Sequence, residues 1–414
     1  MSEVSRREPA FASVFPIAVS HQDMVPAYRQ HQLCNDLSAE EIKQTLDDGL
    51  TYLTKQWTKG EQASNEADPI AQFLCDSIID ARCAAMGLIA LRPHSACSRS
   101  IEEVLAAQYS RRQTLEGVGY YVRNGGSRPL LLINATGTPI TIWNQFLSDE
   151  THDFTIILPE RRGSDLCRGG LQQYVDISAD SADLSSILNA ESLELFDILA
   201  WCHGARVALD LANSRSHQIS SMVLLAPVSK GIHGITPNPS NFERDLQPLF
   251  EAVGADESLA PFLSTTIARQ PPSPDWKRWT KAPATRAQTL FSMPSKALAA
   301  DMMAPLADPQ SFINMGHRVT SDERYPMDQA LRKLEIRTMV IMGSDDNIVS
   351  NDVASLAIKK MCRKPVPVVV IGGSGHYMQD LQYHYFRWLM TEFLEKNQSP
   401  STTARIRVEY LGGS

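Results

Sequence analysis

The chain has 414 residues, 43% of them hydrophobic, and its 39 Lys and Arg against 47 Asp and Glu give a formal net charge of −8 at pH 7. This length can bury a large core and exceeds one typical domain. The acidic balance and the lack of a basic run disfavour a nucleic-acid partner. The sequence contains no run of 18 apolar residues that would predict a membrane span, and residues 1–8 are not followed by an apolar signal segment. We therefore expect a cytoplasmic protein.

Cysteine usage agrees with a reducing compartment. Seven cysteines are scattered along the chain, at positions 34, 75, 83, 97, 167, 202 and 362. Their number is odd and no two have the C-x-x-C spacing of a metal or redox motif. This pattern is typical of reduced thiols. The histidines are equally dispersed, so the sequence predicts neither a metal site nor a bound cofactor.

Residues 1–105 predict a helical extension. Ser38 with Glu41 and Ser100 with Glu103 have the spacing of capping boxes, in which each side chain bonds to a backbone N–H at the start of a helix. Between these pairs, apolar residues recur at helical spacing, which indicates one buried face. We therefore expect the extension to pack on the rest of the protein.

Two apolar runs follow, at residues 130–133 and 154–158, and both have the length of a buried strand. The first run ends in a turn of small and polar residues that includes Thr136 and Gly137.

The most informative stretch lies around Cys202. Residues 195–199 are apolar except for Asp197, and they run through Ala200 into a segment with helical character. A buried strand that feeds directly into a helix needs a sharp turn, and Ala200 and Gly204 place small residues two positions before and after Cys202. The turn would hold Cys202 at the end of the strand and at the start of the helix, where the helix dipole favours a thiolate.

Two further strands end in residues that can serve a nucleophile. Residues 337–342 form an apolar run that leads to a turn containing Asp345 and Asp346. Residues 367–371 form another, which leads through glycines to His376. A nucleophile, an acid and a histidine therefore each follow a predicted strand, in that order along the chain.

This order resembles that of the α/β-hydrolase superfamily, over residues 116–228 and 334–396. In addition, residues 130–137 are similar to the third strand and oxyanion loop of that family, and 153–163 to its next strand and turn. The resemblance implies a mostly parallel central sheet flanked by helices, with a helical lid insertion and the helical N-terminal extension. Three positions depart from the family pattern: Ala200, Cys202 and Ala205.

By this resemblance, Cys202 is the nucleophile and His376 the general base and later acid. Asp346 orients the imidazole, because the family places its acid three residues after the glycine that ends the strand, here Gly343. Asp345 is the rival acid.

The resemblance also implies an oxyanion hole made of backbone N–H groups. His203, the residue after the nucleophile, gives one of them through its backbone alone. Thr136 or Gly137 gives the second, although Asn134 and Ala135 stand where many members have His-Gly.

The resemblance divides the chain into a core at 106–228 and 334–396 and a lid or cap insertion at 229–333. The insertion is rich in proline and methionine, and in this fold it would lie over the nucleophile and select the substrate. Residues 397–414 form a tail, in which 405–410 predict an edge strand.

A cysteine nucleophile favours thioester chemistry, because a thiolate exchanges with an acyl thioester at nearly equal energy. We therefore expect an acyltransferase or thioesterase-like enzyme that forms an acyl-cysteine. Its partners would be a thioester of coenzyme A or of an acyl or peptidyl carrier protein, and a small-molecule acyl acceptor, as in specialised-metabolite biosynthesis. Three alternatives stay open: an ester, lactone or thioester hydrolase; an enzyme like the polyhydroxyalkanoate synthases; and a non-catalytic ligand-binding protein.

Overall fold

The structure is a computed structural model. The described residues are 100–123, 125–151, 153–162, 166–167, 169–232, 235, 240, 242–243, 247–269, 304–344, 346, 348–372, 374–402 and 406–413. They all belong to the unit formed by Ser95–Trp279 and Phe291–Ser414. The predicted N-terminal extension lies outside them except for its last residues, where Ser100 and Glu103 form the predicted capping box at the start of a helix.

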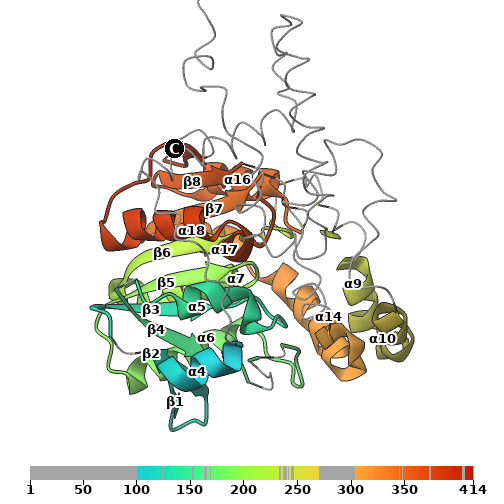
Figure 1. Ribbon diagram of the computed structural model, residues 1–414. Coiled ribbons are helices and arrows are strands. Elements are labelled where there is room, and N and C mark those ends of the chain that lie inside the picture. Colours follow the sequence, from blue (N-terminus) through green and yellow to red (C-terminus); the bar gives the residue numbers. More distant parts are fainter. Residues whose placement is uncertain are drawn as a thin grey trace, which may run out of the picture. The chain divides into compact units, whose positions relative to one another are not determined.

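A nine-stranded sheet forms the centre, in the order β1-β2-β4-β3-β5-β6-β7-β8-β9 (Figure 1). Its strands are β1 Ser110–Gln113, β2 Gly119–Arg123, β3 Arg128–Ile133, β4 Phe154–Pro159, β5 Phe196–Trp201, β6 Ile219–Leu225, β7 Arg337–Gly343, β8 Val366–Ile371 and β9 Ile406–Leu411. The strands from β4 to β8 pair in parallel, whereas β1, β2 and β9 are antiparallel to their neighbours. The predicted mostly parallel sheet is thus confirmed.

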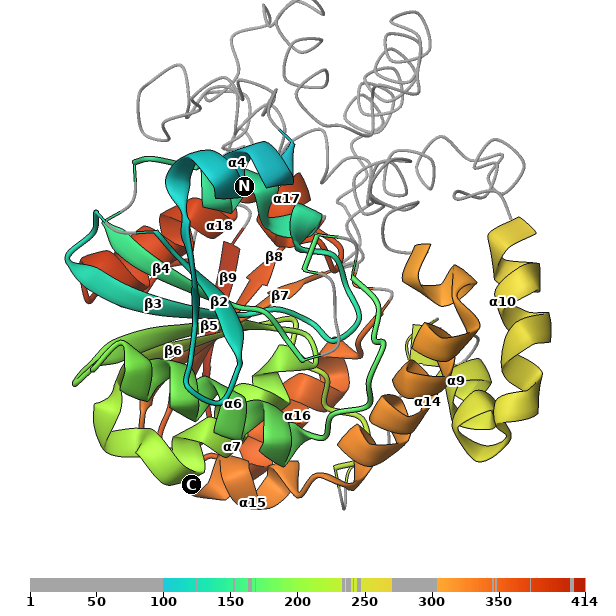
Figure 2. The ribbon, with the colours of Figure 1, turned by 90° about the horizontal axis from the view of Figure 1, so that it is seen from below.

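The central strands are continuous apolar runs because helices cover the sheet on both faces. The helices are α4 Ile101–Gln108, α5 Asn144–Ser148, α6 Ile177–Ala190, α7 Gly204–Arg215, α9 Gln247–Ala255, α10 Ala260–Arg269, α14 Pro309–Arg324, α15 Met327–Arg332, α16 Asn351–Met361, α17 Met378–Leu381 and α18 Tyr383–Met390. In Figure 2, α4, α17 and α18 lie on one side of the sheet and α6, α7 and α16 on the other. Every residue of β5 is buried, and Asp197, its one charge, pairs with Arg128 at 2.9 Å.

The insertion between β6 and β7 contributes helices that pack together around a small apolar cluster. Its members are Leu171, Phe250, Val253, Ala260, Phe312, Met315 and Val319. Helix α14 also fastens this cluster to the segment after β4. The Asn314 side chain donates to the Leu171 carbonyl at 2.7 Å, and the Leu171 N–H donates to Ser311 Oγ at 2.9 Å.

A buried ion-pair network joins α14 to the rest of the unit. Arg318 lies one helical turn before Asp322 and donates to it at 2.5 Å, and it donates to Asp180 of α6 at 2.7 Å. All three side chains are buried. Charged groups in such surroundings need their partners, because an unpaired buried charge is costly.

The C-terminal tail supplies the edge strand that the sequence predicts at 405–410. Strand β9 pairs with β8 from Ile406 to Leu411, and Ile406 is buried. Arg407 and Glu409 of this strand form an ion pair at 3.1 Å. Charged side chains on an edge strand oppose pairing with further chains.

We expect Arg318→Met to destabilise the protein by about 3–5 kcal/mol, because it leaves the carboxylates of Asp180 and Asp322 buried without this guanidinium. The measurement is the urea unfolding midpoint, with Arg324→Met as the control. Arg324 lies on the same helix but is exposed, so its replacement should change stability by no more than about 0.5 kcal/mol. Equal midpoints for the two variants would contradict a stabilising role of the network.

Candidate active site

The turn between β5 and α7 holds Cys202 in a left-handed backbone conformation, with φ of +55°. This conformation is uncommon for a residue other than glycine and marks strain at functional turns. The Cys202 N–H donates to the carbonyl of Leu225 at 2.9 Å, which ties the turn to the end of β6. The structure therefore gives Cys202 the strained strand-to-helix turn that the sequence predicts.

Gly204 makes this turn possible because α7 begins against the end of β3. A Cβ atom at position 204 would lie 2.5 Å from the Ile133 carbonyl oxygen and 2.9 Å from that of Asn134. Backbone atoms cannot give way to such a contact. The small residue two positions after Cys202 is thus required by the approach of the helix to the neighbouring strand.

His376 and Asp346 form a buried pair beyond the ends of β8 and β7. His376 Nδ1 lies 2.9 Å from Asp346 Oδ2, and 3% and 0% of the two side chains are exposed. The other oxygen, Oδ1, accepts the backbone N–H groups of Ile348 at 2.8 Å and Val349 at 3.0 Å. These bonds fix the carboxylate and leave one oxygen for the imidazole. Asp345, the rival acid, lies outside the described residues.

Cys202 lies beside the pair formed by His376 and Asp346. Burial lowers the pKa of His376, but the negative charges of Asp346 and Cys202 and their side-chain hydrogen bonds outweigh burial and raise this pKa to about 10. Trp201 stacks beside the imidazole, with ring centroids 5.2 Å apart, and its Nε1 donates to the His376 carbonyl at 3.3 Å. The structure thus brings together three side chains that lie 30 to 174 positions apart along the chain.

His203 differs from the expectation that it contributes only a backbone N–H. Its Nδ1 atom lies 3.5 Å from Cys202 Sγ. Burial lowers the pKa of His203 well below its usual value, so the ring is neutral near pH 7. Sequence reasoning missed this contact because the direction of a side chain at a turn depends on the neighbouring elements.

The loop at residues 134–138, which includes Thr136 and Gly137, follows β3 and lies beside the start of α7. The Asn134 side chain shapes it by donating to the Thr138 carbonyl at 2.9 Å and accepting from Trp143 Nε1 at 2.9 Å. Gly137 has φ of +67°, and a Cβ atom there would collide with Met315 of α14. The inserted helix therefore packs directly against this loop. The use of its N–H groups as an oxyanion hole remains a prediction.

Guanidinium groups lie near the turn that holds Cys202. The half-buried Arg161 donates to Thr136 Oγ1 and pairs with Asp180 at 3.2 Å, which extends the Arg318 network to the 134–138 loop. The buried Arg206 of α7 donates to the carbonyls of Val228, at 3.3 Å, and of Lys230. The 134–138 loop and α14 are thus joined by Arg161 and Arg318, and Arg206 holds the start of α7 to the segment after β6.

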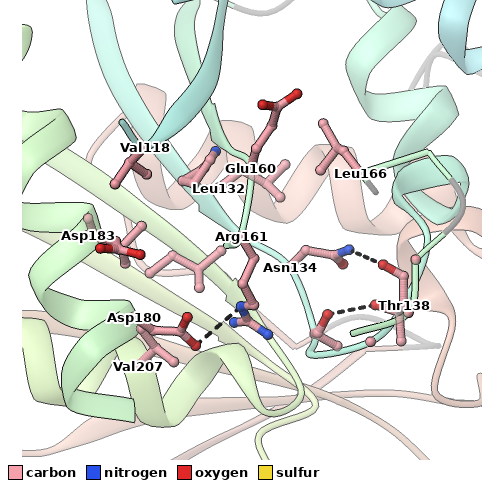
Figure 3. Close-up of a pocket in the computed structure, with 17 residues that line it drawn as sticks. Val118, Leu132, Asn134, Thr138, Glu160, Arg161, Leu166, Asp180, Asp183 and Val207 are labelled. Atoms are coloured by element: carbon pink, nitrogen blue, oxygen red, sulfur yellow. Dashed lines mark hydrogen bonds and ion pairs between the residues drawn. The ribbon is translucent and has the colours of Figure 1, made fainter. Parts of the chain in front are cut away.

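A pocket opens beside the 134–138 loop (Figure 3). Asn134, Thr138, Arg161 and Asp180 line it, and the Arg161–Asp180 pair lies at its base in this view. Among the described residues, neither Cys202 nor His376 lines this pocket. It therefore adjoins the loop beside α6 and does not include the sulfur in its lining.

The described part of the chain contains neither a group of metal ligands nor a membrane-spanning helix. No group of three or more His, Cys, Asp or Glu residues there could hold a metal ion. No helix in the same part is long and apolar enough to cross a membrane.

Comparison with known proteins identifies the family. Residues 130–384 match the model of the alpha/beta hydrolase family. This match spans more than half of the chain, so the chain belongs to that family and is an enzyme of it. The reading of a non-catalytic ligand-binding protein is set aside.

Individual relatives are distant. The curated 2-hydroxy-6-oxo-2,4-heptadienoate hydrolase of Pseudomonas putida is 20% identical over 284 residues, which cover 65% of this chain and 90% of the relative. A thermophilic esterase from Thermogutta terrifontis superposes with a TM-score of 0.50 and 17% identity, over 71% of this chain and 100% of that one. A hydrolase from Pseudomonas aeruginosa superposes with a TM-score of 0.50 and 16% identity, over 70% of this chain and 99% of that one. The two structures show the shared fold.

We expect Gly204→Ala to destabilise the protein by about 1–3 kcal/mol, because the added methyl group forces α7 away from the end of β3. Thermal and urea unfolding midpoints measure the effect. Asn213→Ala, on an exposed position of the same helix, is the control and should change stability little. A Gly204→Ala protein as stable as the parent would show that the turn can relax.

Proposed function

We propose that this enzyme transfers acyl groups through a covalent acyl-cysteine on Cys202, with His376 as general base and acid and Asp346 as the residue that orients it. One observation carries the proposal: a cysteine in the strained turn after β5 lies close enough to act electrostatically on a histidine that a fully buried carboxylate holds. A nucleophile, a base and an orienting acid in this order are the components of nucleophilic acyl transfer.

The first half-reaction acylates the enzyme. The Cys202 thiolate attacks the carbonyl carbon of an acyl thioester, a C–S bond forms, and the carbonyl electron pair moves to oxygen. Backbone N–H groups of His203 and of Thr136 or Gly137 would stabilise this oxyanion. When the intermediate collapses, the original C–S bond breaks and the leaving thiolate takes a proton from the His376 imidazolium.

The second half-reaction releases the acyl group. An amine, alcohol, thiol or water attacks the acyl-cysteine while neutral His376 accepts its proton, and Sγ leaves as the thiolate. The raised pKa of His376 supports this scheme, because a protonated imidazole beside a thiolate is the resting state that the first half-reaction needs. Transfer to an amine or thiol is favoured over hydrolysis, because thioesters react faster with these nucleophiles than with water.

The second candidate is hydrolysis of an ester, lactone or thioester by the same residues. It is favoured by the hydrolase relative from Pseudomonas putida and by the esterase fold. The two functions differ only in the acceptor of the acyl group. A small-molecule acyl acceptor and a role in biosynthesis belong to the first candidate alone.

Intact-protein mass spectrometry after brief exposure to acyl-coenzyme A thioesters tests the covalent step. We expect an acyl mass increment that Cys202→Ala abolishes and Cys167→Ala leaves in place, since Cys167 is a half-buried thiol without a role in the scheme. Release of the increment only on addition of amines or thiols favours transfer, and release in buffer alone favours hydrolysis. An increment that persists in Cys202→Ala would overturn the assignment of the nucleophile.

We expect Asp346→Asn to move the alkaline limb of the kcat/KM profile to lower pH. The Asp346 carboxylate raises the pKa of His376, so the variant loses the protonated imidazole at a lower pH, by at least about one unit. The rate at the optimum should fall about 10²–10⁴-fold. The exposed Asp352→Asn is the matched control, and an unchanged alkaline limb in Asp346→Asn would contradict the pairing.

A further inference from the structure

The Cys202 sulfur lies near two imidazole rings, those of His376 and His203. Besides His376, the neighbouring residue His203 places its Nδ1 atom 3.5 Å from the Cys202 sulfur. This separation is within the range for a hydrogen bond to sulfur, whose acceptor radius exceeds that of oxygen. The family resemblance gives a role only to the backbone N–H of the residue at this position, so the ring contact is unassigned.

Burial and the positive charges around it keep the His203 ring neutral. Burial lowers its pKa most strongly, and nearby positive charges lower it further. These charges come from α7, α14, the segment after β8 and the segment after β4, and belong to Arg206, Arg318, His376 and Arg161 respectively. A neutral imidazole carries one N–H and one unprotonated nitrogen.

The charge of the sulfur decides which nitrogen of His203 carries the proton. In the proposed reaction Cys202 acts as a thiolate, and a negative charge on its sulfur raises the pKa of His376, Arg206 and Tyr377. A thiolate only accepts hydrogen bonds. The contact at 3.5 Å is therefore attractive only when the proton of His203 is on Nδ1.

We propose that His203 is a further catalytic residue, which donates a hydrogen bond from Nδ1–H to the Cys202 sulfur and stabilises it as a thiolate. No proton moves in this step. The bond acts in the free enzyme and again when the acyl–sulfur bond breaks and its electron pair returns to Sγ.

This inference rests on Cys202 being the nucleophile of the proposed function, so its test uses a reaction that needs no acyl donor. The rate at which iodoacetamide alkylates Cys202 is measured by intact mass from pH 5 to pH 10. The variants are His203→Phe and His203→Met, which carry no donor, and His203→Gln, whose amide can donate. His217→Phe, an exposed histidine after α7, is the control, and unfolding midpoints identify any variant that loses its fold.

We expect His203→Phe and His203→Met to be alkylated about 5–10-fold more slowly at pH 7, which corresponds to the loss of one hydrogen bond of ordinary strength. Their rates should approach that of the parent at pH 10, where the thiolate forms without help. His203→Gln should stay within about 2-fold of the parent at all pH values. Identical pH profiles in the parent and in the variants without a donor would overturn the role of His203. A shifted profile in an enzyme that takes no acyl increment would instead support His203 while the proposed acyl transfer fails.

Discussion

The turn at Cys202 is the constraint on which the rest of the site depends. A left-handed backbone at a non-glycine residue persists only when its surroundings hold it. Here the hydrogen bond to Leu225 holds one side, and the contact of Gly204 with the end of β3 holds the other. Because both contacts come from neighbouring parallel strands, the sheet itself positions the sulfur, and β7 and β8 deliver Asp346 and His376 to the same edge.

The electrostatic surroundings give that geometry its chemistry. Guanidinium groups and two imidazoles lie around the sulfur, and the carboxylate of Asp346 pairs with the ring of His376. One histidine is therefore driven towards its charged form and the other towards its neutral form. This division suits the proposed reaction, since one ring must exchange a proton and the other must only donate a hydrogen bond.

Helix α14 of the insertion takes part in the surroundings of the site. Helix α14 brings Arg318 into the buried network and Met315 against Gly137 of the 134–138 loop. Arg161 then connects the same network to Thr136. A movement of α14 would change the surroundings of both the loop and the turn that holds the sulfur, so the position of this helix and the conformation of the loop are physically coupled.

The sequence by itself determined the sheet and the strand-to-helix turn, because apolar runs of strand length and the spacing of Ala200, Cys202 and Gly204 are local signals that burial and sterics impose. It also indicated Asp346 and His376, each directly after such a run. Only the tertiary structure decided the ring contact of His203, the buried arginines and the packing of Met315 on Gly137. Those features depend on side chains from elements far apart in the chain, and their directions and charges are set only once the sheet and helices have packed.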